Sequence, residues 1–225
     1  MNPRNFAEIK IIEAFEKQTD DCPICELIYT SVEKFIEEIL YEFVNDPNTR
    51  SRLRRGICSK HVLAIENTLN NHPELGLLGL AIIYEDIMSE MIKDMVKNCH
   101  TESECLFCKH ESESEKIYVE TCTSFISDIL SIYEKSKRIL CRDHYWKIFS
   151  TTNHINQENL KAIQVKKLLD LKSKLTVFIE KHDYRKDKQM GDTPRACKIA
   201  GMLISNNRIQ DGRNRLWLWR FLPKR

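Results

Sequence analysis

A pattern of paired cysteines that occurs twice constrains this chain more than any other feature. In each copy a Cys-x-x-Cys is followed, after 32 intervening residues, by a Cys-x-x-His, and one offset of 83 residues relates all four positions of the copies. Such a combination of thiols and imidazole is typical of tetrahedral zinc sites. The first copy comprises Cys22, Cys25, Cys58 and His61, and the second comprises Cys105, Cys108, Cys141 and His144.

The simplest interpretation is one Cys3His metal site within each copy. A helix over residues 26–44 would travel roughly 28 Å at about 1.5 Å per residue. Residues 47–57 could return most of that distance, because extended chain covers about 3.3 Å per residue. The spacing therefore predicts that Cys58 returns beside Cys25, and that the metal joins the starts of two helices. Free N–H groups at helix starts suit this role because they stabilise thiolate sulfurs.

Zinc is the expected metal, with two sites per chain, because four N and S ligands complete its coordination sphere. An iron–sulfur cluster held by three cysteines and one histidine is the alternative. Four protein ligands leave no open position for water, which favours structural rather than catalytic metal. Cys99 and His100 could substitute as ligands but are more simply a pair at a helix end, and Cys122 and Cys197 fit small core residues.

Apolar residues recur at helical spacing through most of the chain, which predicts an all-α fold. The expected helices cover 6–16, 26–44, 58–69, 77–98, 157–182 and 194–204, and one more follows Cys108 to about residue 133. Asp46 should cap a further helix that begins at Pro47. The broad apolar stripe of 77–98 predicts a central helix packed between two modules. We expect modules at 1–100 and 101–205, followed by a tail at 206–225.

Charge is distributed unevenly along the chain. Residues 1–184 carry a net charge of −6, whereas residues 185–225 carry +8. A basic terminus rich in tryptophan could bind nucleic acid or an anionic surface, or could pack on the protein itself or on a second subunit. The residues considered for contact with nucleic acid or another partner are Arg54, Arg55, Lys137, Arg138, Arg215, Trp217 and Trp219. The acidic stretch Tyr84-Glu85-Asp86 is more plausibly a buried partner for Arg54, Arg55 or Arg185 than a set of catalytic acids.

Localisation and enzyme class depend on weaker signals. Residues 1–17 have no uninterrupted apolar core of a secretory signal, and the most apolar window, 75–96, contains five charged residues. We therefore expect a cytoplasmic protein with no transmembrane segment and with reduced thiols. No phosphate-binding glycine loop, nucleophile elbow or His-Glu-x-x-His occurs, so nothing indicates an enzyme. The expectation is a zinc-stabilised binding or scaffold protein; a nucleic-acid-binding protein and an iron–sulfur or redox protein are the alternatives.

Several longer motifs resemble those of one family. They are Cys-Pro-Ile-Cys-Glu-Leu from Cys22, Tyr-Glu-Phe-Val-Asn-Asp-Pro from Tyr41, Gly-Ile-Cys from Gly56, residues 78–86, and Asp-Tyr-Arg from Asp183. Together they make residues 6–204 similar to the DUF6062 proteins, an uncharacterised prokaryotic family. The resemblance implies almost nothing about function, and the tail from about Asn206 lies outside it.

Overall fold

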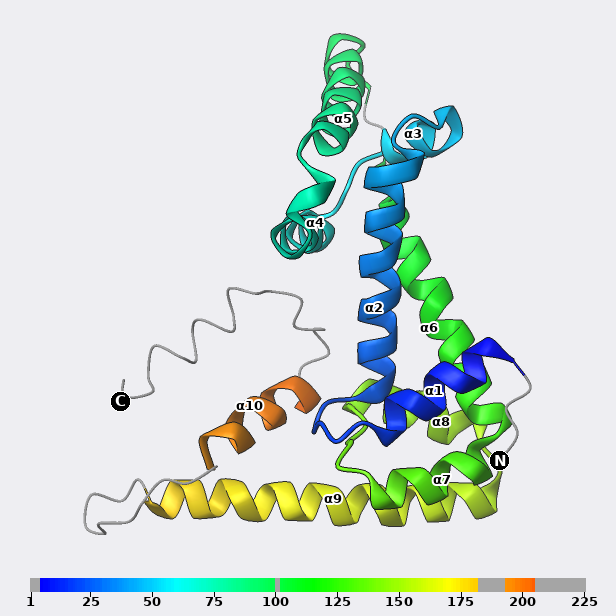
Figure 1. The fold of residues 1–225 in the computed structure, drawn as a ribbon, viewed down its shortest axis with the longest axis vertical. Helices are drawn as coiled ribbons and strands as arrows, with labels where there is room; N and C mark the ends of the chain where they lie inside the picture. The colour runs from blue at the N-terminus through cyan, green and yellow to red at the C-terminus, as the bar shows by residue number, and fades with distance from the viewer. Residues whose placement is uncertain (1–4, 100–101, 182–192, 205–225) are drawn as a thin grey trace. The chain divides into compact units, whose positions relative to one another are not determined.

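The computed structural model describes residues 5–99, 102–181 and 193–204, and within these ranges the chain is helical with short connections (Figure 1). This confirms the all-α class, and the described residues include no strand. No helix among them is long and apolar enough to cross a membrane. The α-helices are α1 (Phe6–Glu16), α2 (Pro23–Glu38), α3 (Pro47–Leu53), α4 (Ser59–Asn71), α5 (Leu78–Val96), α6 (Leu106–Ser124), α7 (Ile126–Lys135), α8 (Arg142–Thr151), α9 (His154–Lys181) and α10 (Thr193–Ile204).

The described residues divide into two compact units. The first unit combines residues up to Leu27 with those from Glu115 onward, and the second is Ile28–Ser114. The boundaries fall within α2 and α6, so both helices contribute to both units. These units do not coincide with the expected modules 1–100 and 101–205, because each unit draws residues from both copies of the cysteine motif.

The first unit is built around α7, which packs against α1 and α9, while α10 packs against α9 (Figure 1). Phe15 of α1 meets the fully buried ring of Tyr133 edge to face, with ring centroids 5.6 Å apart. The Tyr133 hydroxyl accepts a hydrogen bond from the Leu140 backbone N–H at 3.0 Å. This contact fixes the chain just before Cys141, which begins the second Cys-x-x-His.

The second unit contains α3, α4 and α5 with two short helical turns, the π-helical η1 (Ile39–Phe43) and the 3₁₀ turn η2 (Pro73–Leu75). Asp46 caps α3 as predicted, accepting from the Thr49 backbone N–H at 2.7 Å, with Pro47 in the first turn. Gly79 lets α5 approach η1 closely, since a Cβ there would lie 2.8 Å from the Leu40 carbonyl oxygen. Any larger residue would push the two elements apart.

Two expectations about the helices are wrong. The helix expected to run to residue 133 is broken at Phe125, whose φ of −129° and ψ of 34° lie outside the helical region. The stripe of 77–98 is not buried as expected, because one face of α5 is open to solvent. The exposed large apolar side chains on this face include Met88, Met91, Ile92 and Met95. The buried residues of α5, among them Leu80 and Ile83, lie in the N-terminal half of the helix.

Candidate metal sites

The eight predicted cysteines and histidines lie in two groups of four, but the copies exchange partners. The first cluster is Cys22, Cys25, Cys141 and His144, and the second cluster is Cys58, His61, Cys105 and Cys108. Each combines the Cys-x-x-Cys of one copy with the Cys-x-x-His of the other. The prediction that Cys58 returns beside Cys25 is therefore wrong, although the set of eight residues is the one expected from the spacing.

Contacts made by α2 and α6 favour pairing between the two copies over pairing within one copy. Within Ile28–Ser114, Ser31 of α2 lies 3.0 Å from His110 Nε2 of α6, and the His110 ring stacks on Phe35 at 4.1 Å between centroids. Phe35 also meets Phe107 edge to face at 5.8 Å. Spacing alone permits a return within one copy, but Phe107 also lies against the His61 ring, with centroids 5.7 Å apart, so the start of α6 lies beside Cys58 and His61.

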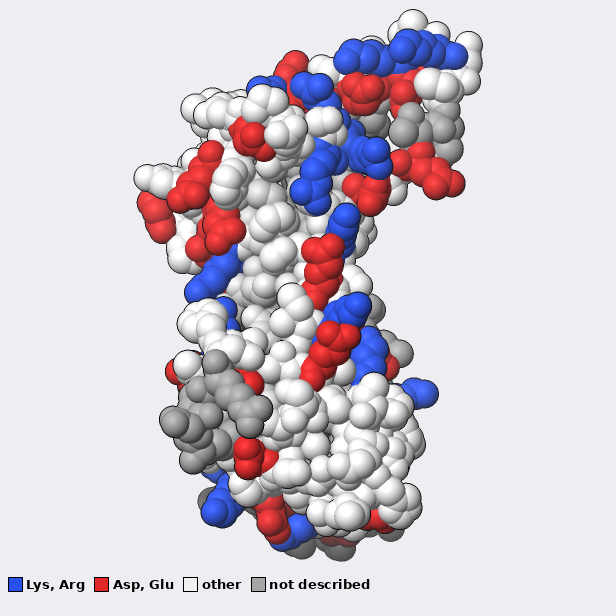
Figure 2. All heavy atoms as spheres, turned by 90° about the vertical axis from the view of Figure 1, so that its right-hand side faces the viewer, with Lys and Arg blue, Asp and Glu red and all other residues white. Residues whose placement is uncertain are grey.

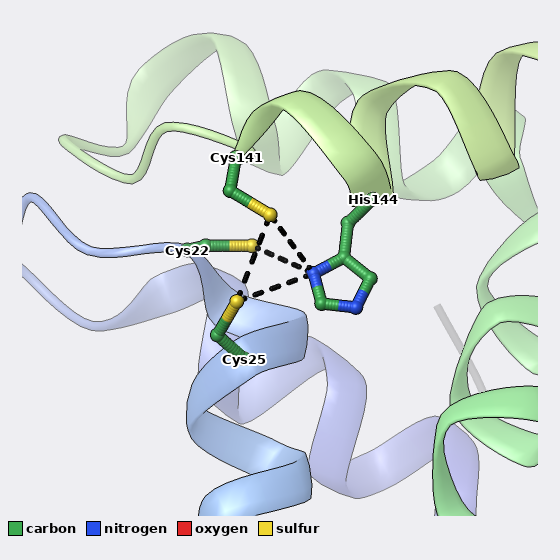
Figure 3. A group of neighbouring side chains, drawn as sticks. All are labelled: Cys22, Cys25, Cys141 and His144. Atoms are coloured by element: carbon green, nitrogen blue, oxygen red, sulfur yellow. Dashed lines mark hydrogen bonds between the residues drawn. The ribbon is translucent and has the colours of Figure 1, made fainter. Parts of the chain in front are cut away.

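In the first cluster the three sulfurs and one ring nitrogen point toward a common centre (Figure 3). His144 Nδ1 lies 3.1 Å from Cys141 Sγ, 3.3 Å from Cys25 Sγ and 3.5 Å from Cys22 Sγ. The sulfurs of Cys25 and Cys141 are 3.6 Å apart. Cys22, Cys141 and His144 are only 4%, 6% and 2% exposed, and Cys25 is half-buried. The cluster is therefore closed to solvent on most sides.

The second cluster has the same internal geometry but a more open position. His61 Nδ1 lies 3.1 Å from Cys58 Sγ, 3.4 Å from Cys108 Sγ and 3.5 Å from Cys105 Sγ, and the sulfurs of Cys58 and Cys108 are 3.5 Å apart. His61 is fully buried, Cys58 and Cys105 are half-buried, and Cys108 is exposed. The sulfurs thus form the solvent-facing side of this cluster.

Both clusters have the dimensions of a cage around one tetrahedral ion. With Zn–S bonds of about 2.3 Å and Zn–N bonds of about 2.0–2.1 Å, tetrahedral geometry requires S–S edges of about 3.8 Å and S–N edges of about 3.6 Å. One sulfur–sulfur edge in each cluster measures 3.5–3.6 Å, the sulfur–nitrogen edges measure 3.1–3.5 Å, and all ligand atoms lie within 4.8 Å of one another. All nine cysteines are free thiols. Both clusters could therefore hold a metal ion.

Electrostatics within the first cluster favour a cation. Burial opposes a charged imidazole, but hydrogen bonds with Cys141 and Cys22 raise the pKa of His144 to about 11. Hydrogen bonds with Cys22 and Cys25 lower the pKa of Cys141, whereas those with Cys141 and Cys22, together with burial, raise the pKa of Cys25. Three thiols this close cannot all ionise unless positive charge lies among them. A divalent ion would supply that charge and deprotonate the ligands.

Every Cys-x-x-Cys and Cys-x-x-His lies at a helix start, as expected. Cys58 and Cys141 are the N-cap residues of α4 and α8, while α2 and α6 begin directly after Cys22 and Cys105. Burial raises the pKa of Cys105, but hydrogen bonds from His61 and from the backbone N–H groups of Cys58 and Cys108 outweigh this effect, so its pKa is lowered. Helix N-termini carry partial positive charge, which suits an anionic Cys3His centre.

Two glutamates of α6 that the spacing did not reveal lie behind the histidines. His144 Nε2 donates to Glu115 Oε1 at 2.9 Å, and Lys147 pairs with the same oxygen at 2.7 Å. In the second cluster Glu111 Oε2 lies 3.6 Å from His61 Nε2, and Lys60 pairs with Glu111 at 2.6 Å. A carboxylate behind a metal-binding imidazole fixes its tautomer and raises its basicity.

Equivalent ion pairs hold the two ends of each cluster together. Arg138, three residues before Cys141, lies 3.8 Å from Asp21, directly before Cys22. Arg55, at the equivalent position of the first copy, pairs at 2.6 Å with Glu104, directly before Cys105. The same offset of 83 relates both pairs. Arg138 also donates to the Ala14 carbonyl at 2.7 Å and pairs with Glu26.

These contacts bear on the residues considered for nucleic acid or partner binding. Arg54 pairs with the buried Asp86 at 3.1 Å, as predicted, and Arg50 joins that pair at 2.5 Å. Arg138 is fully buried, so its guanidinium faces the protein interior, whereas Lys137 is exposed. On the face drawn in Figure 2, Lys and Arg side chains lie interspersed with Asp and Glu. Arg215, Trp217 and Trp219 lie outside the described residues.

The remaining cysteines stand apart from the two clusters. Cys122 is fully buried, as expected for a core residue, and burial raises its pKa to about 12. Cys197 is half-buried in α10. Cys99 is exposed, with its sulfur 3.4 Å from Asp94 Oδ1, and does not join the second cluster. His100 lies outside the described residues.

Comparison with known proteins confirms the resemblance over the first part of the chain. Residues 3–103 match the model of DUF6062, a family of unknown function. The chain is also similar to the "Uncharacterized 23.9 kDa protein in xynA 3'region" of Caldicellulosiruptor sp. (strain Rt8B.4). Identity to that protein is 27% over 186 residues, which cover 78% of this chain and 88% of the relative. No solved structure is significantly similar to this chain.

Proposed function

We propose that this chain is a zinc-stabilised helical binding or scaffold protein that holds one structural zinc ion in each cluster. The observation that carries the proposal is the pair of Cys3His groups whose ligand atoms lie within 4.8 Å of one another. In each cluster the ion would link a Cys-x-x-Cys to a Cys-x-x-His distant in the sequence. Metal binding would then contribute directly to folding, because the ligands converge only in the folded chain.

The size of the clusters supports a single ion rather than an iron–sulfur cluster. In a multinuclear cluster the ligands are distributed over different irons bridged by sulfides, so their atoms must stand farther apart than around one ion. Edges of 3.5–3.6 Å between sulfurs fit ligands that share one centre. Three thiolates and one imidazole also form a common ligand set of structural zinc.

The open face of α5 supports a binding role. Met88, Met91, Ile92 and Met95 are between 52% and 69% exposed. Contiguous apolar side chains on a protein surface commonly mark contacts with other molecules, and methionine adapts its shape to such contacts. The arginines considered for nucleic acid are largely committed to ion pairs, which favours a protein partner over nucleic acid.

Elemental analysis of protein purified without oxygen and without chelator tests the metal assignment. We expect two zinc ions per chain, no iron or inorganic sulfide, and no absorbance in the visible range. A strong chelator should remove the zinc and lower the thermal midpoint of unfolding. Iron together with sulfide, or a fully reduced protein that binds no zinc even when it is supplied, would overturn the proposal.

A further inference from the structure

The two clusters differ in how far solvent reaches their sulfurs. Cys58, Cys105 and Cys108 all line one surface pocket of about 450 Å³, and Cys108 is exposed. In the first cluster Cys22 and Cys141 are almost completely buried, and only Cys25 is partly accessible. A small polar molecule can therefore reach sulfur in the second cluster far more easily than in the first.

The second cluster is also held less firmly. His144 of the first cluster is fixed by a 2.9 Å hydrogen bond to Glu115, whereas His61 Nε2 is fully buried, lies 3.6 Å from Glu111 and has no hydrogen-bond partner among the described residues. The ion pairs that join the two ends of each cluster also differ in burial. The side chain of Arg138, beside the first cluster, is fully buried, whereas that of Arg55, beside the second, is 61% exposed. Fewer interactions therefore hold the second set of ligands in place.

We propose that the second cluster is an oxidation-sensitive metal site, which releases its ion when Cys58 and Cys108 form a disulfide. This inference rests on the proposed function, because it requires a metal ion in each cluster. The oxidant is hydrogen peroxide or another small two-electron peroxide. Such molecules react with exposed thiolates, and metal binding keeps the cysteines deprotonated.

The chemistry needs two steps. The Cys108 thiolate attacks one peroxide oxygen; the S–O bond forms, the O–O bond breaks, hydroxide leaves, and sulfur is oxidised by two electrons to a sulfenic acid. The Cys58 thiolate, 3.5 Å away, then attacks that sulfur; the S–S bond forms, the S–O bond of the sulfenic acid breaks, and its oxygen leaves as a second hydroxide. The ion keeps only Cys105 and His61 and is released. Lys109, on the wall of the same pocket, adds positive charge that favours the departing hydroxide.

Proximity alone does not separate the clusters, because Cys25 and Cys141 of the first are also only 3.6 Å apart. The clusters differ instead in how easily solvent reaches their sulfurs, and the oxidation of a thiolate depends on how easily the oxidant reaches it. The two clusters of one chain therefore serve as matched internal controls. The second should lose metal at peroxide concentrations that leave the first intact.

The test uses the full chain with Cys99→Ser and Cys197→Ser, which removes the accessible thiols outside both clusters. Metal content is measured first, and protein without zinc at this stage would contradict the proposed function. Hydrogen peroxide is then added, and released zinc is followed with a metallochromic dye. We expect one equivalent to be released about tenfold faster than the other, because reactivity follows exposure of the thiolate. A thiol reductant should restore binding of that equivalent.

Peptide mass mapping after the fast phase should show a Cys58–Cys108 disulfide, while Cys22, Cys25 and Cys141 remain available for alkylation. Cys108→His keeps four ligands but removes the reacting sulfur, so it should abolish the fast phase. Cys25→His is the matched change in the first cluster, and it should leave the fast phase of zinc release from the second cluster unaltered. Release of both ions at one rate, or oxidation of the first cluster before the second, would overturn this inference while leaving the zinc assignment intact.

Discussion

Ser31 Oγ of α2 lies 2.9 Å from Ser114 Oγ of α6, and these two serines occupy equivalent positions of the repeat, 83 residues apart. The helices that begin at the two Cys-x-x-Cys motifs therefore meet through corresponding residues. His110 completes this contact through its bond to Ser31. The exchange of partners between the copies agrees with such a meeting, since every Cys-x-x-Cys finds its histidine in the other copy.

Paired cysteine substitutions should distinguish the exchanged pairing from pairing within one copy. Cys25→Ser with Cys141→Ser removes two ligands of the same cluster, so one zinc ion per chain should remain. Cys25→Ser with Cys58→Ser removes one ligand from each cluster, and both ions should be lost. Zinc per chain, measured after gel filtration, checks this. If the Cys25 and Cys58 variant keeps one ion and the other variant keeps none, the pairing described above is wrong.

Glu115 should strengthen metal binding by the first cluster through His144. Glu115→Gln weakens the acceptor for the imidazole N–H, and loss of such a partner typically lowers metal affinity about 10–100-fold. Competition against a chelator of known affinity measures the change. Glu113→Gln alters an exposed carboxylate on the same helix and provides the matched control. Equal affinities for both variants would show that Glu115 does not position His144.

Arg138 and Arg55 occupy equivalent positions but should differ greatly in their contribution to stability. Arg138→Gln leaves the carboxylate of Glu26 without its buried partner, and breaking a buried pair costs about 3–5 kcal/mol. Arg55→Gln disrupts a pair whose side chains are 61% and 57% exposed, so we expect a loss below about 1 kcal/mol. Urea unfolding with zinc present measures both. Similar losses in the two variants would contradict the assigned difference in burial.

His72 should make stability depend on pH. Its ring lies 3.1 Å from Glu74 and 3.2 Å from Glu37, and these carboxylates, Glu74 foremost, raise its pKa above the ordinary value of 6.5. Because the folded pKa is the higher one, the stabilisation is fully present below the unfolded pKa and is lost as pH rises through the folded value. The difference in urea midpoint between the natural chain and His72→Gln should therefore be largest near pH 6 and shrink toward pH 9. A difference independent of pH would show that these ion pairs do not stabilise the fold.

The identity of the ligands and of most helices could be predicted from local pattern. Asp46 and Pro47 mark a helix start that depends only on neighbouring residues, and the structure places it there. The eight ligands were recognisable because two copies repeat the same spacing. Burial of Cys122 likewise follows from its place on an apolar stripe.

Pairing of the clusters could not be predicted because it depends on contacts distant in the sequence. Phe35 and His110 stack across α2 and α6, but neither residue carries a signal for its partner. Glu111 and Glu115 resemble other surface glutamates in sequence until the fold places them behind the histidines. The helix break at Phe125 could not be predicted because no proline or glycine occurs there. The exposed apolar stripe of α5 has the same helical spacing in the sequence as a buried stripe.

The exchange of partners also means that neither half of this polypeptide contains a complete cluster. Dividing the chain near residue 100 would give one fragment with Cys22, Cys25, Cys58 and His61, and another with the remaining four ligands. Each fragment would then carry half of each cluster, and the other half of each cluster would lie on the other fragment. Only recombination of the fragments could rebuild both clusters, so a metal ion bound in either cluster would join the two halves rather than stabilise one of them alone.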